Sequence, residues 1–217
     1  MPSNKSKTIE KQNGMNKVAI HHLKKDQVMS RLIERHGLLE LKPRRASTFQ
    51  SLTQAIIHQQ LSGKAAGAIL GRFIALYPGK RFPSAADVLA TKPERLREVG
   101  LSRAKSSYIR DIAQRVKDRK VPGLKASQRL TDEDLIMILT EVKGVGRWTA
   151  EMLLIFNLGR EDVLPLDDLG VRRGFQLAHR RNELPTAAEL AEYGRKLAPY
   201  RSYAAMYFWR EVDSSDN

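Results

Sequence analysis

The apolar positions between residues 18 and 213 recur every three or four residues, as on amphipathic helices, and we find no segment with strand-like alternation. Many apolar segments follow a helix-start signal, a Ser or Thr with an acidic residue or Gln three positions later. Such pairs are Ser47 with Gln50, Ser84 with Asp87, Thr131 with Asp134, and Thr186 with Glu189. Glycines and prolines separate the segments. The pattern predicts an all-α protein of short helices.

The same signals give approximate boundaries for individual helices. Residues 18–41 predict one helix or two, ended by Pro43, which cannot continue a helix. A helix from Ser47 is expected to run to a break at Gly63. The Ala- and Gly-rich segment that follows predicts a helix whose low bulk would permit close contact with another helix. Further along, Asp168 is a candidate N-cap residue.

Composition narrows the function classes. A chain of 217 residues, 41% of them hydrophobic, is long enough to build a core. Its 38 Lys and Arg against 24 Asp and Glu give a net charge of +14, so nucleic acid is the natural partner. The chain has no cysteine, which excludes disulfides, thiolate zinc sites and cysteine-ligated iron–sulfur clusters and fits a cytoplasmic or nuclear protein. No apolar segment approaches the roughly 20 residues that span a bilayer, so membrane insertion and secretion are not expected.

The segment LTEVKGVGRWTAEM, residues 139–152, joins two predicted helices by a turn that contains Gly144 and Gly146. These glycines would allow positive φ angles and bring bare backbone close to a ligand. The helix that begins near Arg147 would present N–H groups and the positive end of its dipole to a phosphate. An ordinary helical hairpin with a glycine turn is the structural alternative.

The segment VKGVGRWTA resembles the helix–hairpin–helix signature of DNA glycosylases, and PLDDLGV resembles the segment where that superfamily keeps its essential aspartate. The segments AIIHQQLSGKAA, GLSRAKSSYI and PYRSYAAMYFW look like the branch that includes 3-methyladenine DNA glycosylase II. The resemblance spans about residues 18–210. It implies a two-lobed helix–hairpin–helix glycosylase fold with the active site in the cleft between the lobes. It also implies base excision repair: alkylated purines of the 3-methyladenine and 7-methylguanine type are flipped out of double-stranded DNA and excised.

The resemblance implies a domain organisation as well. We expect a flexible basic tail at residues 1–16, a discontinuous helical lobe at 17–47 plus 160–213, and a central helical lobe at 48–159 that ends in the helix–hairpin–helix. The enzyme is expected to be a monomer that requires no cofactor.

A fixed carboxylate suits cleavage of an N-glycosidic bond, because positive charge builds on the sugar in the transition state. The carboxylate can also orient or deprotonate the attacking water. Asp167 and Asp168 are both candidates, and simple helix capping is the structural alternative for either. The family pattern D-x-x-V matches Asp168 with Val171, so catalysis is assigned to Asp168, 22 positions after Gly146.

The resemblance places four residues in the base pocket: Trp148, Met152, Leu169 and Trp209. Trp148 stands where family members with lyase activity have a lysine nucleophile, which implies a monofunctional enzyme that leaves an abasic site. Its ring face would attract the positive charge of a methylated purine, although a core tryptophan is the structural alternative. Trp209 is expected beside the aspartate. Met152 and Leu169 replace pocket tyrosines of the bacterial 3-methyladenine enzyme, which leaves the range of lesions open.

The resemblance also implies contacts to DNA. The loop HQQLSG would supply the wedge that fills the gap left by a flipped base, and the candidates are Gln60 and Leu61. We favour Gln60, because helix capping and core packing explain Leu61 more readily. Further DNA contacts are expected at Gly144, Val145, Gly146, Arg147, Thr149, Arg172 and Arg173. A structural monovalent or divalent cation is expected at the backbone carbonyls of Thr140, Val142 and Val145.

Two alternatives stay open. The first is a non-catalytic helix–hairpin–helix protein that only grips the DNA backbone, and the presence of Asp168 at the family spacing argues against it. The second is a glycosylase for other damaged bases. Trp148 in the lysine position argues against an oxidised-base glycosylase with lyase activity.

Overall fold

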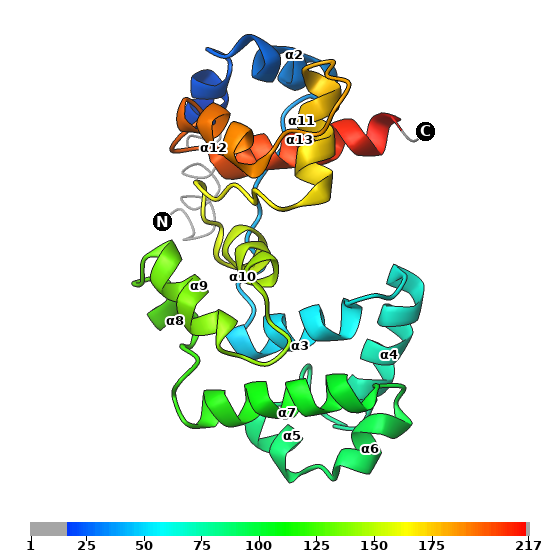
Figure 1. Cartoon of the computed structure of the whole chain (residues 1–217). Helices are drawn as coiled ribbons and strands as arrows, with labels where there is room; N and C mark the ends of the chain where they lie inside the picture. Colours follow the sequence, from blue (N-terminus) through cyan, green and yellow to red (C-terminus); the bar gives the residue numbers. More distant parts are fainter. Residues whose placement is uncertain (1–16, 216–217) are drawn as a thin grey trace, which may run out of the picture. The chain divides into compact units, whose positions relative to one another are not determined.

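The computed structural model describes residues 17–215, and this part of the chain consists of helices and loops with no strand (Figure 1). The predicted all-α class is therefore confirmed. These described residues divide into two compact units, one formed by residues 17–43 together with 159–215, the other by Arg44–Leu158. The tail expected at residues 1–16 lies outside the described residues. Within 17–215, no helix is both long enough and apolar enough to cross a membrane.

The unit Arg44–Leu158 holds its core between α3, α7, α9 and α10. Its elements are α3 (Thr48–His58), α4 (Gly63–Ala75), α5 (Ala85–Ala90), α6 (Pro93–Glu98), α7 (Arg103–Lys117), α8 (Leu124–Ser127), α9 (Asp132–Thr140), α10 (Arg147–Leu153) and the π-helical turn η1 (Leu154–Leu158). Helix α7 packs against α3 and α5, and α10 packs against α3 and α9. Ile56 of α3, Ile109 and Ile112 of α7, and Leu135 of α9 are fully buried there. Because each helix exposes its polar positions and buries its apolar ones, the periodicity of the sequence becomes one core.

Four helices of the chain begin at the predicted side-chain caps. Ser47, Ser84, Thr131 and Thr186 each accept a hydrogen bond from the backbone N–H three positions later. At Ser84 and Thr186 the acidic residue returns a second hydrogen bond, which completes a capping box. Each cap contributes about 1 kcal/mol to the stability of its helix.

Two boundary predictions were wrong. Residues 17–23 and α2 (Gln27–His36) are separate helices, in agreement with the two-helix alternative, but Gly37, with a φ of +72°, ends the second one well before the predicted end at Pro43. Gly63 is the first residue of α4 and not the break before it. The chain instead turns at Gln60, which has a φ of +55°.

The glycines of α4 do not mediate the predicted helix contact, whereas Ala66 is fully buried and α4 packs against α3. Gly67 and Gly71 are exposed, and a Cβ atom added to either would have no neighbouring atom within 4 Å. A close helix contact made through a glycine occurs in the other unit, between α11 and α13.

That other unit contains residues 17–23, α2, α11 (Leu169–Ala178), α12 (Ala187–Arg195) and α13 (Arg201–Ser215). Helix α13 packs against α11 and α2, with Tyr207 and Phe208 fully buried. A Cβ atom on Gly174 of α11 would overlap the backbone of Phe208. Glycine at position 174 therefore lets α11 and α13 approach closely. Because of this approach, side chains of α13 can reach the N-terminus of α11.

Candidate functional site

Asp168 lies at the N-terminus of α11, and its carboxylate is held from two directions. Oδ1 accepts a hydrogen bond of 2.7 Å from the backbone N–H of Val171 and one of 2.8 Å from the indole Nε1–H of Trp209. The first bond is an ordinary N-cap contact. The second comes from α13 and is not needed for capping. Together the two bonds restrict the rotamer of the carboxylate, whereas Asp167 is exposed.

Gly170 makes the contact between Trp209 and Asp168 possible. A Cβ atom on Gly170 would lie 2.8 Å from Cδ1 and 3.1 Å from Nε1 of Trp209, and 3.1 Å from Oδ1 of Asp168. The hydrogen bond thus runs through space that only glycine leaves open. Neither Gly170 nor Gly174 was among the predicted site residues, although two glycines four positions apart inside a predicted helix are a recognisable sign of close packing.

The remaining candidates of this unit lie around the same helix. Leu169 is 65% exposed, directly after the aspartate. Arg172 Nε donates to the carbonyl of Pro185 at 2.8 Å, and an Nη of Arg173 donates to Oε1 of Gln176 at 2.6 Å. Since a guanidinium carries five N–H donors, both arginines keep donors that could meet a phosphate.

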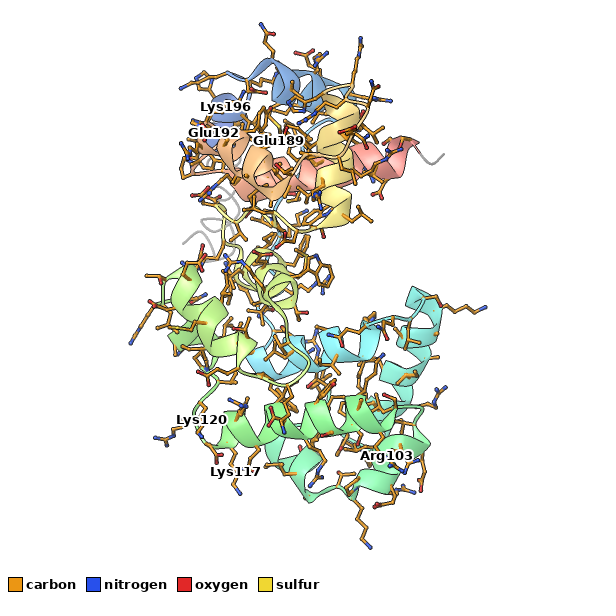
Figure 2. The ribbon with its side chains drawn as sticks, viewed as in Figure 1. Arg103, Lys117, Lys120, Glu189, Glu192 and Lys196 are labelled. Carbon is orange, nitrogen blue, oxygen red and sulfur yellow. The ribbon has the colours of Figure 1, made fainter. Side chains whose placement is uncertain are left out.

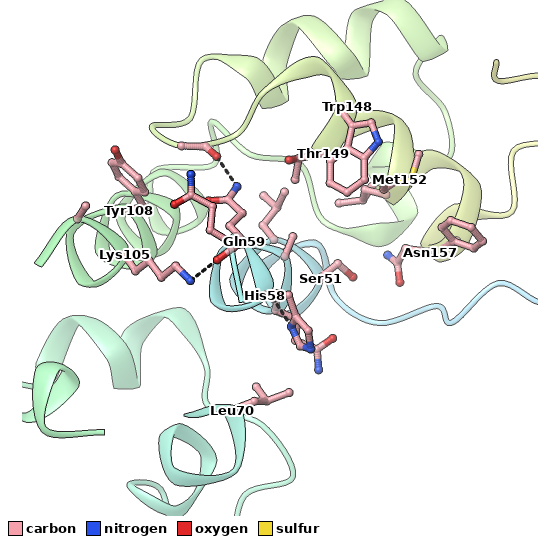
Figure 3. A pocket seen from close by; sticks show the side chains of 18 of the residues that line it. Ser51, His58, Gln59, Leu70, Lys105, Tyr108, Trp148, Thr149, Met152 and Asn157 are labelled. Carbon is pink, nitrogen blue, oxygen red and sulfur yellow. Dashed lines mark hydrogen bonds between the residues drawn. The ribbon is translucent and has the colours of Figure 1, made fainter. Parts of the chain in front are cut away.

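In the unit Arg44–Leu158, a cavity of about 1010 Å³ lies among α3, α7 and α10 (Figure 3). Trp148 and Met152, one turn apart on α10, line it together with Gln60 and Gly144. Trp148 is 50% exposed, so it is not the core tryptophan of the structural alternative. The structure thus brings together two of the four base-pocket candidates here, and Leu169 and Trp209 belong to the other unit.

The two hairpin glycines differ in conformation. Gly144 has a φ of +81°, and a Cβ atom on it would overlap the ring of Tyr108. Gly146 has a φ of −90° and a ψ of 172°, so the prediction of a positive φ was wrong at this position. Gly146 is the N-cap residue of α10, has no side chain to cap that helix, and would have no neighbour within 4 Å of an added Cβ. Of these two residues, only Gly144 must therefore be a glycine for the chain to adopt its backbone conformation.

The other hairpin candidates lie in and around the start of α10. Val145 and Thr149 are buried, and Thr149 belongs to the lining of the cavity. Arg147 forms ion pairs with Glu133 of α9 at 2.7 Å and with Glu151 at 3.0 Å. The hydrogen bond between Arg147 and Glu133 raises the pKa of the guanidinium and lowers that of the carboxyl group. The pair with Glu133 connects α10 with α9, the pair with Glu151 lies within α10, and both offset part of the positive charge at the hairpin.

Both wedge candidates face solvent. Gln60 is exposed at its positive φ, and Leu61 is 39% exposed. Core packing, which the sequence analysis offered for Leu61, is therefore not its role. Both side chains project from the loop between α3 and α4.

The comparisons with known proteins agree with this geometry. Residues 53–199 match the HhH-GPD superfamily of base excision DNA repair proteins. The chain belongs to this superfamily. Over 206 residues it is 35% identical to DNA-3-methyladenine glycosylase 1 of Schizosaccharomyces pombe, covering 93% of this chain and 90% of that protein.

Two solved structures extend the similarity to the backbone. The S. pombe 3-methyladenine DNA glycosylase Mag1 in complex with abasic DNA has a TM-score of 0.80 and 35% identity, covering 92% of this chain and 98% of that chain. The DNA-3-methyladenine glycosidase of Bacillus halodurans has a TM-score of 0.82 and 33% identity, covering 90% of this chain and 88% of that chain. The similarity at both levels confirms the predicted helix–hairpin–helix glycosylase fold.

Proposed function

We propose that this protein is a DNA glycosylase of base excision repair that hydrolyses the N-glycosidic bond of alkylated purines in double-stranded DNA. The observation that carries the proposal is the carboxylate of Asp168, held by Val171 and by the indole of Trp209 in a member of a base excision repair superfamily. The relatives named as 3-methyladenine glycosylases support the choice of alkylated purines as the substrate class.

The catalytic role of Asp168 follows from its chemistry. Cleavage of the bond between base and sugar builds positive charge on the sugar, and a carboxylate fixed in one rotamer stabilises that charge without having to reorganise. The same group can orient or deprotonate the water that attacks the sugar. Trp209 holds the carboxylate in place, and Leu169 contributes apolar surface beside it.

The base pocket would use the exposed ring of Trp148. A methylated purine carries a positive charge that an indole face attracts more strongly than it attracts a neutral base. Trp148 also occupies the position of the lysine nucleophile in relatives with lyase activity, so the enzyme would form no Schiff base and would leave an abasic site. Met152, one turn along α10, shapes the same wall of the cavity.

The hairpin would hold DNA through its backbone. Gly144 and Gly146 carry no side chain that would keep a phosphate away from the main-chain N–H groups, and such contacts are independent of base sequence. Gln60 or Leu61 would fill the gap left by the flipped base, and Arg172 and Arg173 would meet phosphates nearby.

The hairpin carbonyls would also hold a structural cation. The carbonyl of Val142 accepts a hydrogen bond of 3.0 Å from the N–H of Val145, which leaves its second lone pair for a cation. With the carbonyls of Thr140 and Val145, it would hold a monovalent or divalent ion between protein and phosphate. The proposed hydrolysis needs no cofactor. We expect a monomer that acts in the cytoplasm of a bacterium or archaeon, or in a nucleus.

Base release from defined duplexes tests the function. We expect the protein to release 3-methyladenine and 7-methylguanine and to leave a strand that breaks only after alkali treatment. Release of hypoxanthine or ethenoadenine with no release of alkylated purines would replace the proposal by a glycosylase for other damaged bases. Binding with no release from any of these duplexes would identify a non-catalytic DNA-binding protein.

A further inference from the structure

Lys105, in the first turn of α7, caps the C-terminal end of α3. Its Nζ atom donates a hydrogen bond of 2.9 Å to the carbonyl of Ile57. A second one, of 2.7 Å, goes to the carbonyl of Gln59 (Figure 3). The last carbonyls of a helix have no partner within the helix and carry the negative end of its dipole. Burial lowers the pKa of Lys105, which means that the ammonium group has given up hydration for these two carbonyls.

The segment that Lys105 caps leads directly into the wedge loop. Gln60 follows Gln59 with a φ of +55°, a conformation that residues other than glycine rarely adopt. Gln60 is exposed and Leu61 is 39% exposed, so the packing of these two side chains restrains the loop only in part. The hydrogen bonds of Lys105 to the preceding turn are therefore a main restraint on where the two side chains point.

The hairpin contacts the face of α7 that carries Lys105. Tyr108 lies against Gly144, and Oδ2 of Asp111 accepts a hydrogen bond of 3.2 Å from the backbone N–H of Lys143. Residues 105, 108 and 111 follow one another at intervals of three, so they share one side of the helix. The side-chain amide of Gln59 joins the end of α3 directly to the hairpin, because its Nε2 donates a hydrogen bond of 2.9 Å to the carbonyl of Gly144.

We propose that Lys105 is a positioning residue for base flipping, which holds the wedge loop in fixed register with the hairpin. The inference rests on the proposed function, because it concerns the wedge and the DNA grip of that function. The hairpin would bind the DNA backbone. The restrained loop would then present Gln60 and Leu61 at a fixed distance from the phosphate that the hairpin binds. A loop released from Lys105 would sample other conformations and insert the wedge less often, although the hairpin would still bind DNA.

The test compares Lys105→Met with Arg103→Met. Arg103 is exposed, lies two residues earlier on α7 and loses the same charge (Figure 2). Three quantities are measured on the full chain: the single-turnover rate of 3-methyladenine release, the affinity for an undamaged duplex, and the fluorescence of a 2-aminopurine placed next to the lesion, which rises when bases unstack.

For Lys105→Met we expect base release to slow by about 10- to 100-fold, the range expected for loss of charge-assisted hydrogen bonds. The fluorescence rise should be lost, while the affinity for undamaged DNA stays within about 3-fold of that of Arg103→Met. A merely structural role would not separate flipping from binding. Lys105→Gln keeps an uncharged N–H donor on a shorter chain and provides the same comparison, with a smaller loss, if Lys105→Met does not fold.

Equal rates for a folded Lys105→Met and Arg103→Met would overturn the inference. So would a parallel loss of affinity for undamaged DNA, because Lys105 would then support the hairpin or meet a phosphate. The proposed function fails separately, since in that case the unaltered protein would release no base.

Discussion

Gly170→Ala places one methyl group in the path of the hydrogen bond between Trp209 and Asp168. The added Cβ would lie 2.8 Å from Cδ1 of Trp209, about 0.7 Å closer than the roughly 3.5 Å at which two carbon atoms rest. If the indole moves away by this amount, its hydrogen bond of 2.8 Å stretches beyond the range in which such bonds are effective. The carboxylate then loses the restraint from α13, while its bond from Val171 remains.

The expected loss follows from the strength of that bond. A hydrogen bond to a charged group contributes about 1.5–3 kcal/mol, which corresponds to a rate reduction of about 10- to 100-fold if the carboxylate acts in the transition state. Overpacking costs about 1–3 kcal/mol of folding free energy, partly offset by the higher helix propensity of alanine, so the net loss of stability is about 0–2 kcal/mol. For a chain of this length the Tm should fall by at most about 8 °C.

Single-turnover release of 3-methyladenine measures the effect, with Gly71→Ala as the matched control. Gly71 lies inside α4, and an added Cβ has no neighbour within 4 Å, so this variant should keep its rate and fold at least as well. Both proteins are compared at a temperature where melting curves show them folded. If Gly170→Ala and Gly71→Ala released the base at the same rate, the contact of Trp209 with Asp168 would have no part in catalysis.

Three further predictions concern the carboxylates, the missing lyase and the hairpin. Asp168→Asn should abolish base release with duplex affinity within a few-fold, and Asp167→Asn should have a much smaller effect; the reverse result would show that the assignment is wrong by one residue. Borohydride should trap no covalent adduct on any lesion duplex, because Trp148 replaces the amine, and an adduct that disappears in Lys143→Ala would contradict this. Gly146→Ala should weaken binding to damaged and undamaged duplexes alike without loss of stability, because its φ of −90° suits alanine and only a bound phosphate would meet the new methyl group. Unchanged affinity in a binding titration would show that phosphate is held elsewhere.

The sequence alone indicated where several helices begin, and that Asp168 starts one of them. A Ser or Thr with its partner three residues later acts within a single turn, so the caps at Ser84 and Thr186 follow from nearest neighbours in the chain. The periodicity of the apolar positions was equally local and led to the all-α class. Resemblance of the hairpin and aspartate segments to a known superfamily then indicated the chemistry.

The tertiary structure decided which distant side chains reach those positions. Trp209 meets Asp168 from 41 residues away, as the family resemblance implied, but the helical pattern does not say which residue of another helix will arrive there, and only the structure shows that Gly170 leaves the space open. The tertiary structure also gave the two hairpin glycines different conformations: Gly144 has a positive φ and lies against Tyr108, whereas Gly146 is extended. A glycine permits both conformations, so only the neighbours packed around it select one of them.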